Sequence, residues 1–271
     1  MRNAKPMTLV ALFLAAGCGK ATQPKPQCKA QQEEYAAKYI PDGFDPAAPP
    51  DGCTADDVLA GEVLNLQYYR ADLNGAPKLA IEPASIADAI AVGEEHKVDV
   101  KPEPEFSIGA FKDVFPDDHD ICLAPKLDAT SLHVDAIPPD PAMPDDKGTP
   151  AVDLTYKWAN VKVLTKPLSN AVHFGAELER TTGTCTLKYK VSAVYPVIFC
   201  GDKEKPVLDE MGKETGEMEP DFENSKPLDH KEACAPSEAG HSEGSGLPDL
   251  KYECPEKVLL CVPSVPFPAT N

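Results

Sequence analysis

Nine cysteines are the residues of this 271-residue chain whose type and spacing most directly predict chemistry. One of them, Cys18, lies near the N-terminus, apart from the rest. No two cysteines are separated by two residues, which excludes zinc-ribbon, thioredoxin-type and haem-attachment motifs. An even number of remaining cysteines in an exported chain predicts four disulfide bonds. Those eight residues are Cys28, Cys53, Cys122, Cys185, Cys200, Cys234, Cys254 and Cys261.

Eight cysteines can form four disulfides in many different combinations, and the sequence separates these combinations only by how close the cysteines are along the chain. It favours the pairs Cys28–Cys53, Cys254–Cys261, Cys200–Cys234 and Cys122–Cys185. One pair is excluded: a strand beginning at Cys185 and reaching about residue 195 spans roughly 33 Å, so Cys185 cannot bond to Cys200.

The segment Gly240–Gly244 has the Gly-x-Ser-x-Gly spacing of a hydrolase nucleophile elbow, with Ser242 at its centre. That elbow requires a buried strand before the serine and a helix after it. Neither flank has such a pattern, and all six histidines lie at or before residue 241, whereas the hydrolase order needs one after the serine. We therefore interpret the segment as a Gly/Ser loop and assign no catalytic residue.

Acidic and histidine residues offer weaker candidates for metal binding. Residues 117–120 read Asp-Asp-His-Asp, and carboxylate oxygens suit Ca²⁺. Their spacing is not that of a calcium loop, which favours a solvated acidic turn. His133 and His173 fall in strand-like segments and are expected on strand faces rather than as ligands. No phosphate-binding or dinucleotide fingerprint is present, so no metal and no cofactor are expected.

Alternating apolar residues predict about ten short strands. The clearest run over residues 63–70, 78–82, 105–114, 152–158, 161–163, 171–180, 185–195 and 257–262. The change of phase at Ala159-Asn160 indicates either a tight turn or a β-bulge. Two helices are expected: Ala30–Ile40, where Tyr35 and Tyr39 are one turn apart, and Ser85–Gly93, which opens with a capping-box pattern.

A hairpin with a precise register is expected around Gly183. A two-residue loop at Thr182-Gly183 would place Leu178 opposite Leu187. The residues expected in the core are then Phe174, Leu178, Leu187 and Val191, and those expected at the surface are Glu177 and Lys188.

These elements predict a mainly β, disulfide-bonded antiparallel β-sandwich-like fold with one or two short helices and long Pro-rich loops. Residues 28–135 are expected to form an α+β region, 136–150 a Pro/Asp-rich linker or loop, and 151–271 a β-sandwich-like region. Within the last, residues 201–256 have a net charge of −10 and few apolar residues. They predict an irregular excursion pinned by Cys234 and Cys254.

The N-terminus has the order of an export signal. Arg2 and Lys5 precede an uncharged apolar run from Met7 to Ala16, which is too short to span a bilayer. The run ends in Leu14-Ala15-Ala16-Gly17-Cys18, which resembles the lipobox of bacterial lipoproteins. The resemblance implies that residues 1–17 are a signal peptide, that Cys18 carries acyl chains such as palmitate, and that residues 18–27 form a lipidated tether. Gly19 favours an outer-membrane location, either periplasmic or surface-exposed.

Charge and composition limit the functional classes. The net charge of −18, with only three arginines, argues against nucleic-acid binding. We expect a membrane-anchored exported lipoprotein that is not an enzyme. It would act as a non-catalytic binding or envelope-structural module whose partner is an envelope or extracellular protein or a glycan. The alternatives are an exported hydrolase with scattered catalytic residues, and a cation-dependent surface adhesin that uses the acidic loops.

Overall fold

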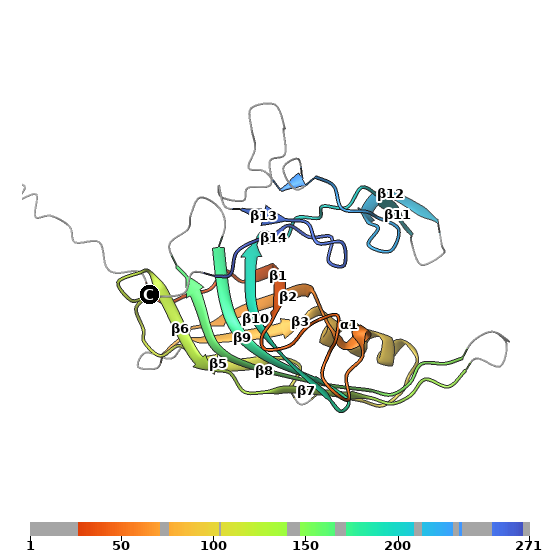
Figure 1. Ribbon diagram of the computed structural model, residues 1–271, viewed down its shortest axis with the longest axis horizontal. Helices are drawn as coiled ribbons and strands as arrows, with labels where there is room; N and C mark the ends of the chain where they lie inside the picture. Colours follow the sequence, from red (N-terminus) through yellow and green to blue (C-terminus); the bar gives the residue numbers. More distant parts are fainter. Residues whose placement is uncertain are drawn as a thin grey trace, which may run out of the picture.

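The structure is a computed structural model that describes residues 27–70, 76–102, 104–139, 147–165, 172–208, 213–229, 233–234 and 251–267 (Figure 1). The predicted signal peptide, Cys18 and Ser242 lie outside these residues. Within the described part of the chain, no helix is long and apolar enough to cross a membrane.

The fold is mainly β and antiparallel, as predicted, and its centre is a ten-stranded sheet of order β4-β7-β8-β9-β10-β1-β2-β3-β5, with β6 pairing β8. Its strands are β1 (Glu33–Pro41), β2 (Gly61–Tyr69), β3 (Lys78–Pro83), β4 (Val100–Pro102), β5 (Ser107–Ala110), β6 (Ile121–Lys126), β7 (Thr130–Val134), β8 (Val152–Leu164), β9 (Val172–Thr182) and β10 (Cys185–Tyr195). Strands β7 and β8 are paired neighbours, and the described residues 136–139 and 147–150 lie between them in the chain.

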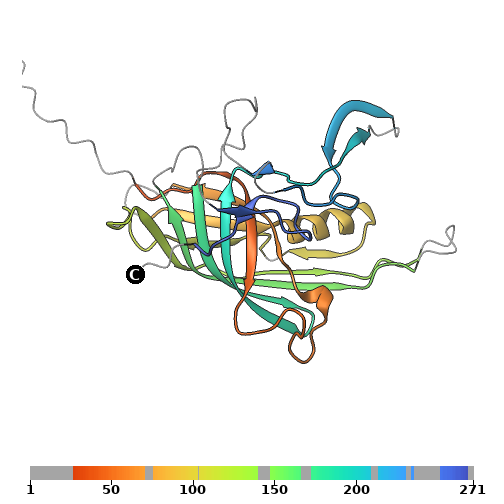
Figure 2. The same cartoon turned by 45° about the horizontal axis from the view of Figure 1, so that its top comes forward.

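The sheet is strongly curled (Figure 2), and its β5 edge contacts β6. Just after β5, the Lys112 amide donates to the carbonyl oxygen of Leu123 at 2.7 Å. The Asp128 amide donates to the carbonyl oxygen of Ile108, in β5, at 2.8 Å. These bonds close a seam between the β5 edge and β6. The inner face holds one core that includes Tyr35, Trp158 and Phe174. The sandwich-like packing is therefore that of a single sheet curled over its own core.

Helix α1 (Ala84–Glu95) confirms the predicted helix at 85–93 and packs against β2, β3, β4 and β7. A second helical turn, η1 (Ala55–Asp57), lies in the long loop after β1. The predicted capping box at Ser85 is wrong, because Pro83 is the N-cap and no side chain of the helix caps it. Instead, the Ser85 amide donates to the carboxylate of Glu62, on β2, at 2.9 Å.

The predicted helix at Ala30–Ile40 is wrong: these residues contain β1, which lies between β10 and β2. Tyr35 and Tyr39 are four residues apart, a spacing that puts two residues on one side of either a helix or a strand. Both are buried on the inner face, with Ala37 between them. Sheet pairing on both sides of the strand overrides the local preference for a helix.

The β9–β10 hairpin has the predicted faces but not the predicted register. Thr182 pairs with Cys185 and Leu178 pairs with Tyr189, so the loop is Gly183-Thr184 and the pairing is shifted by two residues. A shift of two keeps every side chain on its face. The core residues Phe174, Leu178, Leu187 and Val191 are buried as expected, and Glu177 and Lys188 are exposed.

At Ala159-Asn160 the chain forms a β-bulge rather than a turn. Strand β8 runs through these residues without interruption, and its register against β9 shifts between Ala159 and Lys162. Asn160 has a φ of 50°, a left-handed conformation that asparagine tolerates. The bulge therefore explains why Trp158 and Val161 both point into the core.

The segment after β10 packs on the outer face of the sheet, where it is seen above β1 and β10 in Figure 1. It contains the hairpin β11 (Glu204–Leu208) and β12 (Glu214–Pro220), and the short pair β13 (Tyr252–Glu253) and β14 (Val262–Pro263). The hairpin corrects the expectation that 201–256 is wholly irregular, although its residues are mostly exposed. The predicted strand at 257–262 is also wrong, since residues 256–258 form a turn.

All eight predicted cysteines form disulfides, but none of the predicted pairs does. The bonds join Cys28–Cys122, Cys53–Cys185, Cys200–Cys254 and Cys234–Cys261. The expectation that Cys185 does not bond to Cys200 is confirmed. The predicted pairs were wrong because they joined cysteines that are close in sequence, whereas the sheet brings together residues that are far apart in sequence. Cys53 and Cys185, for example, are 132 residues apart. The sulfurs of Cys200, Cys234 and Cys261 lie within 4.8 Å of one another, so two disulfides are side by side.

The seam between β5 and β6 depends on the absence of a side chain at Gly109. A Cβ there would collide with the carbonyl oxygen of Lys126 and lie 3.0 Å from the Cα of Leu127. We expect Gly109→Ala to lower the free energy of unfolding by about 1–3 kcal/mol in urea denaturation, because backbone must move to accommodate the methyl group. The half-buried neighbour provides the control: Ile108→Val should cost less than about 1.5 kcal/mol. Equal stability of Gly109→Ala and the parent protein would contradict this account.

Candidate functional site

The structure places the weaker metal candidates in ordinary structural roles. The Asp117 carboxylate accepts hydrogen bonds from the amides of His119 and Ile121, at 2.8 and 2.9 Å, and these bonds lower the pKa of Asp117. This geometry fits the predicted solvated acidic turn.

Both candidate histidines lie on strand faces, as predicted. His133 is half-buried, and its two ring nitrogens bond to Asp153 and Asp135, so it has acidic partners that the sequence interpretation overlooked. These carboxylates raise the pKa of His133. His173 is buried beneath Tyr252, whose hydroxyl lies 3.4 Å from its Nε2 atom. Loss of solvation lowers the pKa of His173 to about 4.

A polar cluster lies inside the curled sheet and is centred on the half-buried carboxylate of Glu62. Its Oε1 atom accepts from the hydroxyls of Tyr39, at 2.7 Å, and Tyr156, at 3.0 Å. Its Oε2 atom accepts from the amide and hydroxyl of Ser85, at 2.9 and 2.7 Å. Four donors from β1, β8 and α1 therefore converge on one carboxylate.

A buried guanidinium completes this cluster. Arg180, on β9, donates from Nε to the hydroxyl of Tyr156 at 3.0 Å and from Nη1 to the carbonyl oxygen of Asp57 at 3.1 Å. Burial, followed by the charge of Glu62, raises the pKa of both Tyr39 and Tyr156, so these phenols are protonated donors. The charge of Glu62 is thus compensated by a positive group and by neutral donors within one network.

The cluster was missed by sequence reasoning, although its signal was present. Glu62 precedes the alternating run of β2 and shares the inner face with Leu64 and Leu66. Arg180 likewise extends the inward row of β9, and Tyr156 that of β8. A charged residue at an inward-facing position of an otherwise apolar strand face predicts a buried polar group that needs a hydrogen-bonding partner. In this chain that pattern indicates the cluster better than any local motif does.

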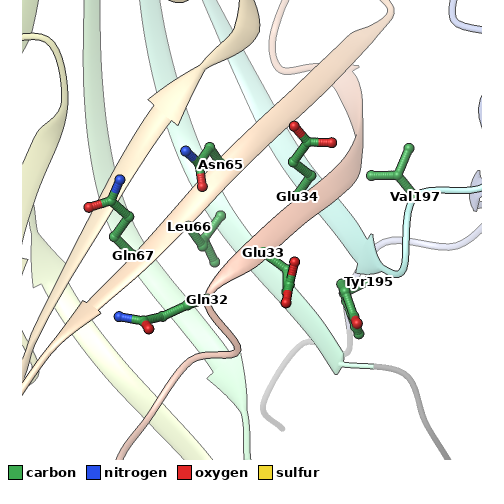
Figure 3. Close-up of a pocket in the computed structure, with 8 residues that line it drawn as sticks. All are labelled: Gln32, Glu33, Glu34, Asn65, Leu66, Gln67, Tyr195 and Val197. Atoms are coloured by element: carbon green, nitrogen blue, oxygen red, sulfur yellow. The ribbon is translucent and has the colours of Figure 1, made fainter.

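A solvent-accessible groove lies where the N-terminal end of β1, the end of β10 and the neighbouring part of β2 meet, beside the segment that leaves β10 (Figure 3). Its volume is about 580 Å³. Polar side chains line most of it, and they are joined by one aromatic ring and two aliphatic groups: Gln32, Glu33, Glu34, Asn65, Gln67, Tyr195, Leu66 and Val197. Amide and carboxylate groups are accessible here, in contrast to the saturated carboxylate of Glu62. The groove can therefore bind a ligand that offers several hydrogen-bonding groups.

The Glu62 cluster should contribute strongly to stability. We expect Glu62→Ala to lower the free energy of unfolding by about 3 kcal/mol, because buried phenol donors lose their acceptor and α1 loses its cap. Glu82→Ala is the matched control: Glu82 is half-buried on β3 and accepts only a 3.3 Å bond from Asn65, so the loss should be below about 1 kcal/mol. Urea denaturation measures both. Similar losses for the two variants would show that the cluster has no special role.

The MlpA family model matches residues 33–196. This segment begins with β1 and ends one residue after β10, so it comprises the whole ten-stranded sheet and α1. A Myxococcus xanthus protein described as "Putative lipoprotein MlpA" is 28% identical over 211 residues, which are 77% of this chain and 82% of that protein. No solved structure matches the chain. Because the family model covers more than half of the sequence, the chain belongs to the MlpA family.

Proposed function

We propose that this protein is an exported lipoprotein, anchored to the outer membrane through acyl chains on Cys18, that acts as a non-catalytic binding module of the cell envelope. The observation that carries the proposal is the N-terminal order of basic residues, apolar run and Leu14–Cys18 lipobox. The name of the Myxococcus xanthus relative supports the same class of protein. Residues 1–17 would be removed, leaving Cys18 as the first residue.

Four disulfides support export independently. Bonded cysteines persist in the periplasm and at the cell surface, whereas cytosolic reductants keep thiols reduced. The bonds tie distant parts of the fold, with sequence separations of 94 and 132 residues in the sheet. Disulfides that close long loops restrict the unfolded chain most strongly. The protein would therefore depend on an oxidising compartment for its stability.

The groove over β1 and β2 is the surface that we assign to binding, with a glycan as the ligand. Sugar hydroxyls both donate and accept hydrogen bonds, which suits the adjacent amides of Gln32, Asn65 and Gln67. The half-buried ring of Tyr195 lines the same groove at the end of β10, and its ring contact with Tyr35 fixes its position. Peptidoglycan is the glycan within reach of a periplasmic lipoprotein.

Lipidation is tested at Cys18. In cells fed a labelled palmitate, we expect the label to appear in the parent protein and to be absent from Cys18→Ser, which should also leave the membrane fraction, because the thioether and the new amine carry the acyl chains. Ser131→Ala, which removes an exposed hydroxyl from β7, is the control, because a second cysteine variant would break a disulfide. An unmodified thiol at Cys18, or an intact Met1, found by mass spectrometry would refute the proposal.

Glycan binding is tested by co-sedimentation with purified peptidoglycan sacculi, using the chain from residue 18 with Cys18→Ser to keep it in solution. We expect the double variant Asn65→Ala, Gln67→Ala to bind about tenfold more weakly, since two hydrogen-bonding amides are removed. Thr181→Ala with Thr186→Ala is the matched control, because these exposed hydroxyls bond to each other on β9 and β10, away from the groove. Failure of the parent chain to sediment, or equal binding by both double variants, would contradict this assignment.

A further inference from the structure

Two exposed apolar residues lie where the N-terminal segment joins the fold. Val114 and Phe115, in the loop from β5 to β6, are 37% and 47% exposed. The amide of Cys28 donates to the carbonyl oxygen of Val114 at 2.8 Å, and the Cys28–Cys122 disulfide fixes the same point to β6. These side chains are therefore adjacent to the residue from which the chain continues toward Cys18.

The two residues belong to a groove rather than to an isolated apolar spot. The groove has a volume of about 580 Å³ and includes apolar groups from the loop and from β6: Cys28, Val114, Phe115, Pro116, Ile121 and Leu123. Apolar side chains that gather at the surface around a hollow mark a contact surface more often than a single exposed residue does.

The loop is held by its own backbone, so its apolar residues have a defined position. The Lys112 amide bonds to Leu123 at 2.7 Å on one side, and the Asp117 carboxylate accepts from two amides on the other. Val114 and Phe115 lie between these fixed points and face solvent. Their exposure is not that of a fraying terminus, because both ends of the loop are bonded to the sheet or to the turn before β6.

The length of chain before the fold identifies what covers these residues. Nine residues separate Cys18 from Cys28, and a fully extended segment of this length reaches at most about 35 Å. A lipid on Cys18 therefore keeps the Cys28 end of the fold next to the bilayer. Tyr69, the last residue of β2, is 39% exposed. It pairs with Lys78 of β3, which in turn pairs with Ala110, the last residue of β5 before the Val114-Phe115 loop. An amphipathic ring therefore lies toward the end of the sheet that carries this loop.

We infer that the Val114-Phe115 loop inserts into the interface of the bilayer that anchors the chain, and thereby sets the orientation of the curled sheet on the membrane. The inference rests on the proposed lipid anchor. The exposed carboxylates of Asp113, Asp117 and Asp118 outnumber the exposed ammonium group of Lys112, so anionic headgroups would repel this loop. The surface that fits the loop is therefore zwitterionic rather than anionic.

The test uses the mature chain from residue 18, with an N-terminal histidine tag in place of the lipid, bound to nickel-chelating phosphatidylcholine vesicles. This tether reproduces the anchor without depending on lipidation in cells. Phe115→Trp introduces a reporter, and Phe222→Trp is the matched control, since Phe222 is 50% exposed in the segment after β10. The native Trp158 is 1% exposed and contributes a constant background.

We expect the emission added by Phe115→Trp to fall about twofold when the lipids carry brominated acyl chains, because the ring lies at the acyl boundary. Emission added by Phe222→Trp should be unchanged. Replacing part of the phosphatidylcholine with phosphatidylglycerol should reduce the quenching of the first variant. Equal emission of Phe115→Trp in brominated and ordinary vesicles would overturn the inference, and stronger quenching by anionic vesicles would overturn its charge preference.

The unsubstituted chain supplies a second readout. Binding to the vesicles should slow amide hydrogen exchange in residues 112–117 relative to the same protein in solution, and should leave β11 and β12 unaffected. Unchanged exchange in residues 112–117 would overturn the inference whether or not the tryptophan variants fold. Because the tag replaces the acyl chains, either result stands apart from the labelling experiment at Cys18, so failure of the anchor and failure of the docking loop are distinguishable.

Discussion

The carboxylate of Glu62 imposes the constraint on which the rest of the fold depends. A half-buried charge at the edge of an apolar core destabilises the folded state unless donors surround it. Here the donors come from β1, β8 and α1, and Arg180 adds a positive group from β9. The strands that meet at this point lie on both sides of the sheet order, so satisfying the carboxylate requires the sheet to be curled. The same carboxylate caps α1, which couples helix position to sheet curvature.

A second constraint is burial on both faces of β1 and β10. Ala36 and Val194 point away from the main core, yet both are fully buried by the segment that follows β10. That segment brings Tyr252, Leu260 and Val262 onto the outer face. Two of the four disulfides lie within the sheet region and two within this segment, so each part is cross-linked internally. Beyond the continuous chain, no disulfide joins the two parts, and their contact is maintained by apolar packing and by polar contacts such as the Lys38–Glu253 ion pair.

The family relationship and the architecture divide the chain at the same place. The MlpA model ends at residue 196, where β10 has ended and the outer-face segment begins. The polar groove lies at this boundary, because Tyr195 and Val197 line one side of it and β1 and β2 the other. The apolar loop at Val114 and Phe115 lies instead by Cys28, where the chain enters the sheet. Anchor and proposed ligand are thus assigned to different features of one rigid scaffold.

The sequence by itself determined the class of fold, the inward and outward faces of β9 and β10, and the participation of all eight cysteines in disulfides, because alternation and an even cysteine count can be read without the tertiary structure. Phe174, Leu178, Leu187 and Val191 were assigned to the core correctly even though their register was shifted by two, since a shift of two preserves the face. Only the tertiary structure decided that Ala30–Ile40 contains a central strand, since Tyr35 and Tyr39 share a side in either element. It also decided which cysteines bond and which donors reach Glu62, because both depend on how a curled sheet brings distant residues together.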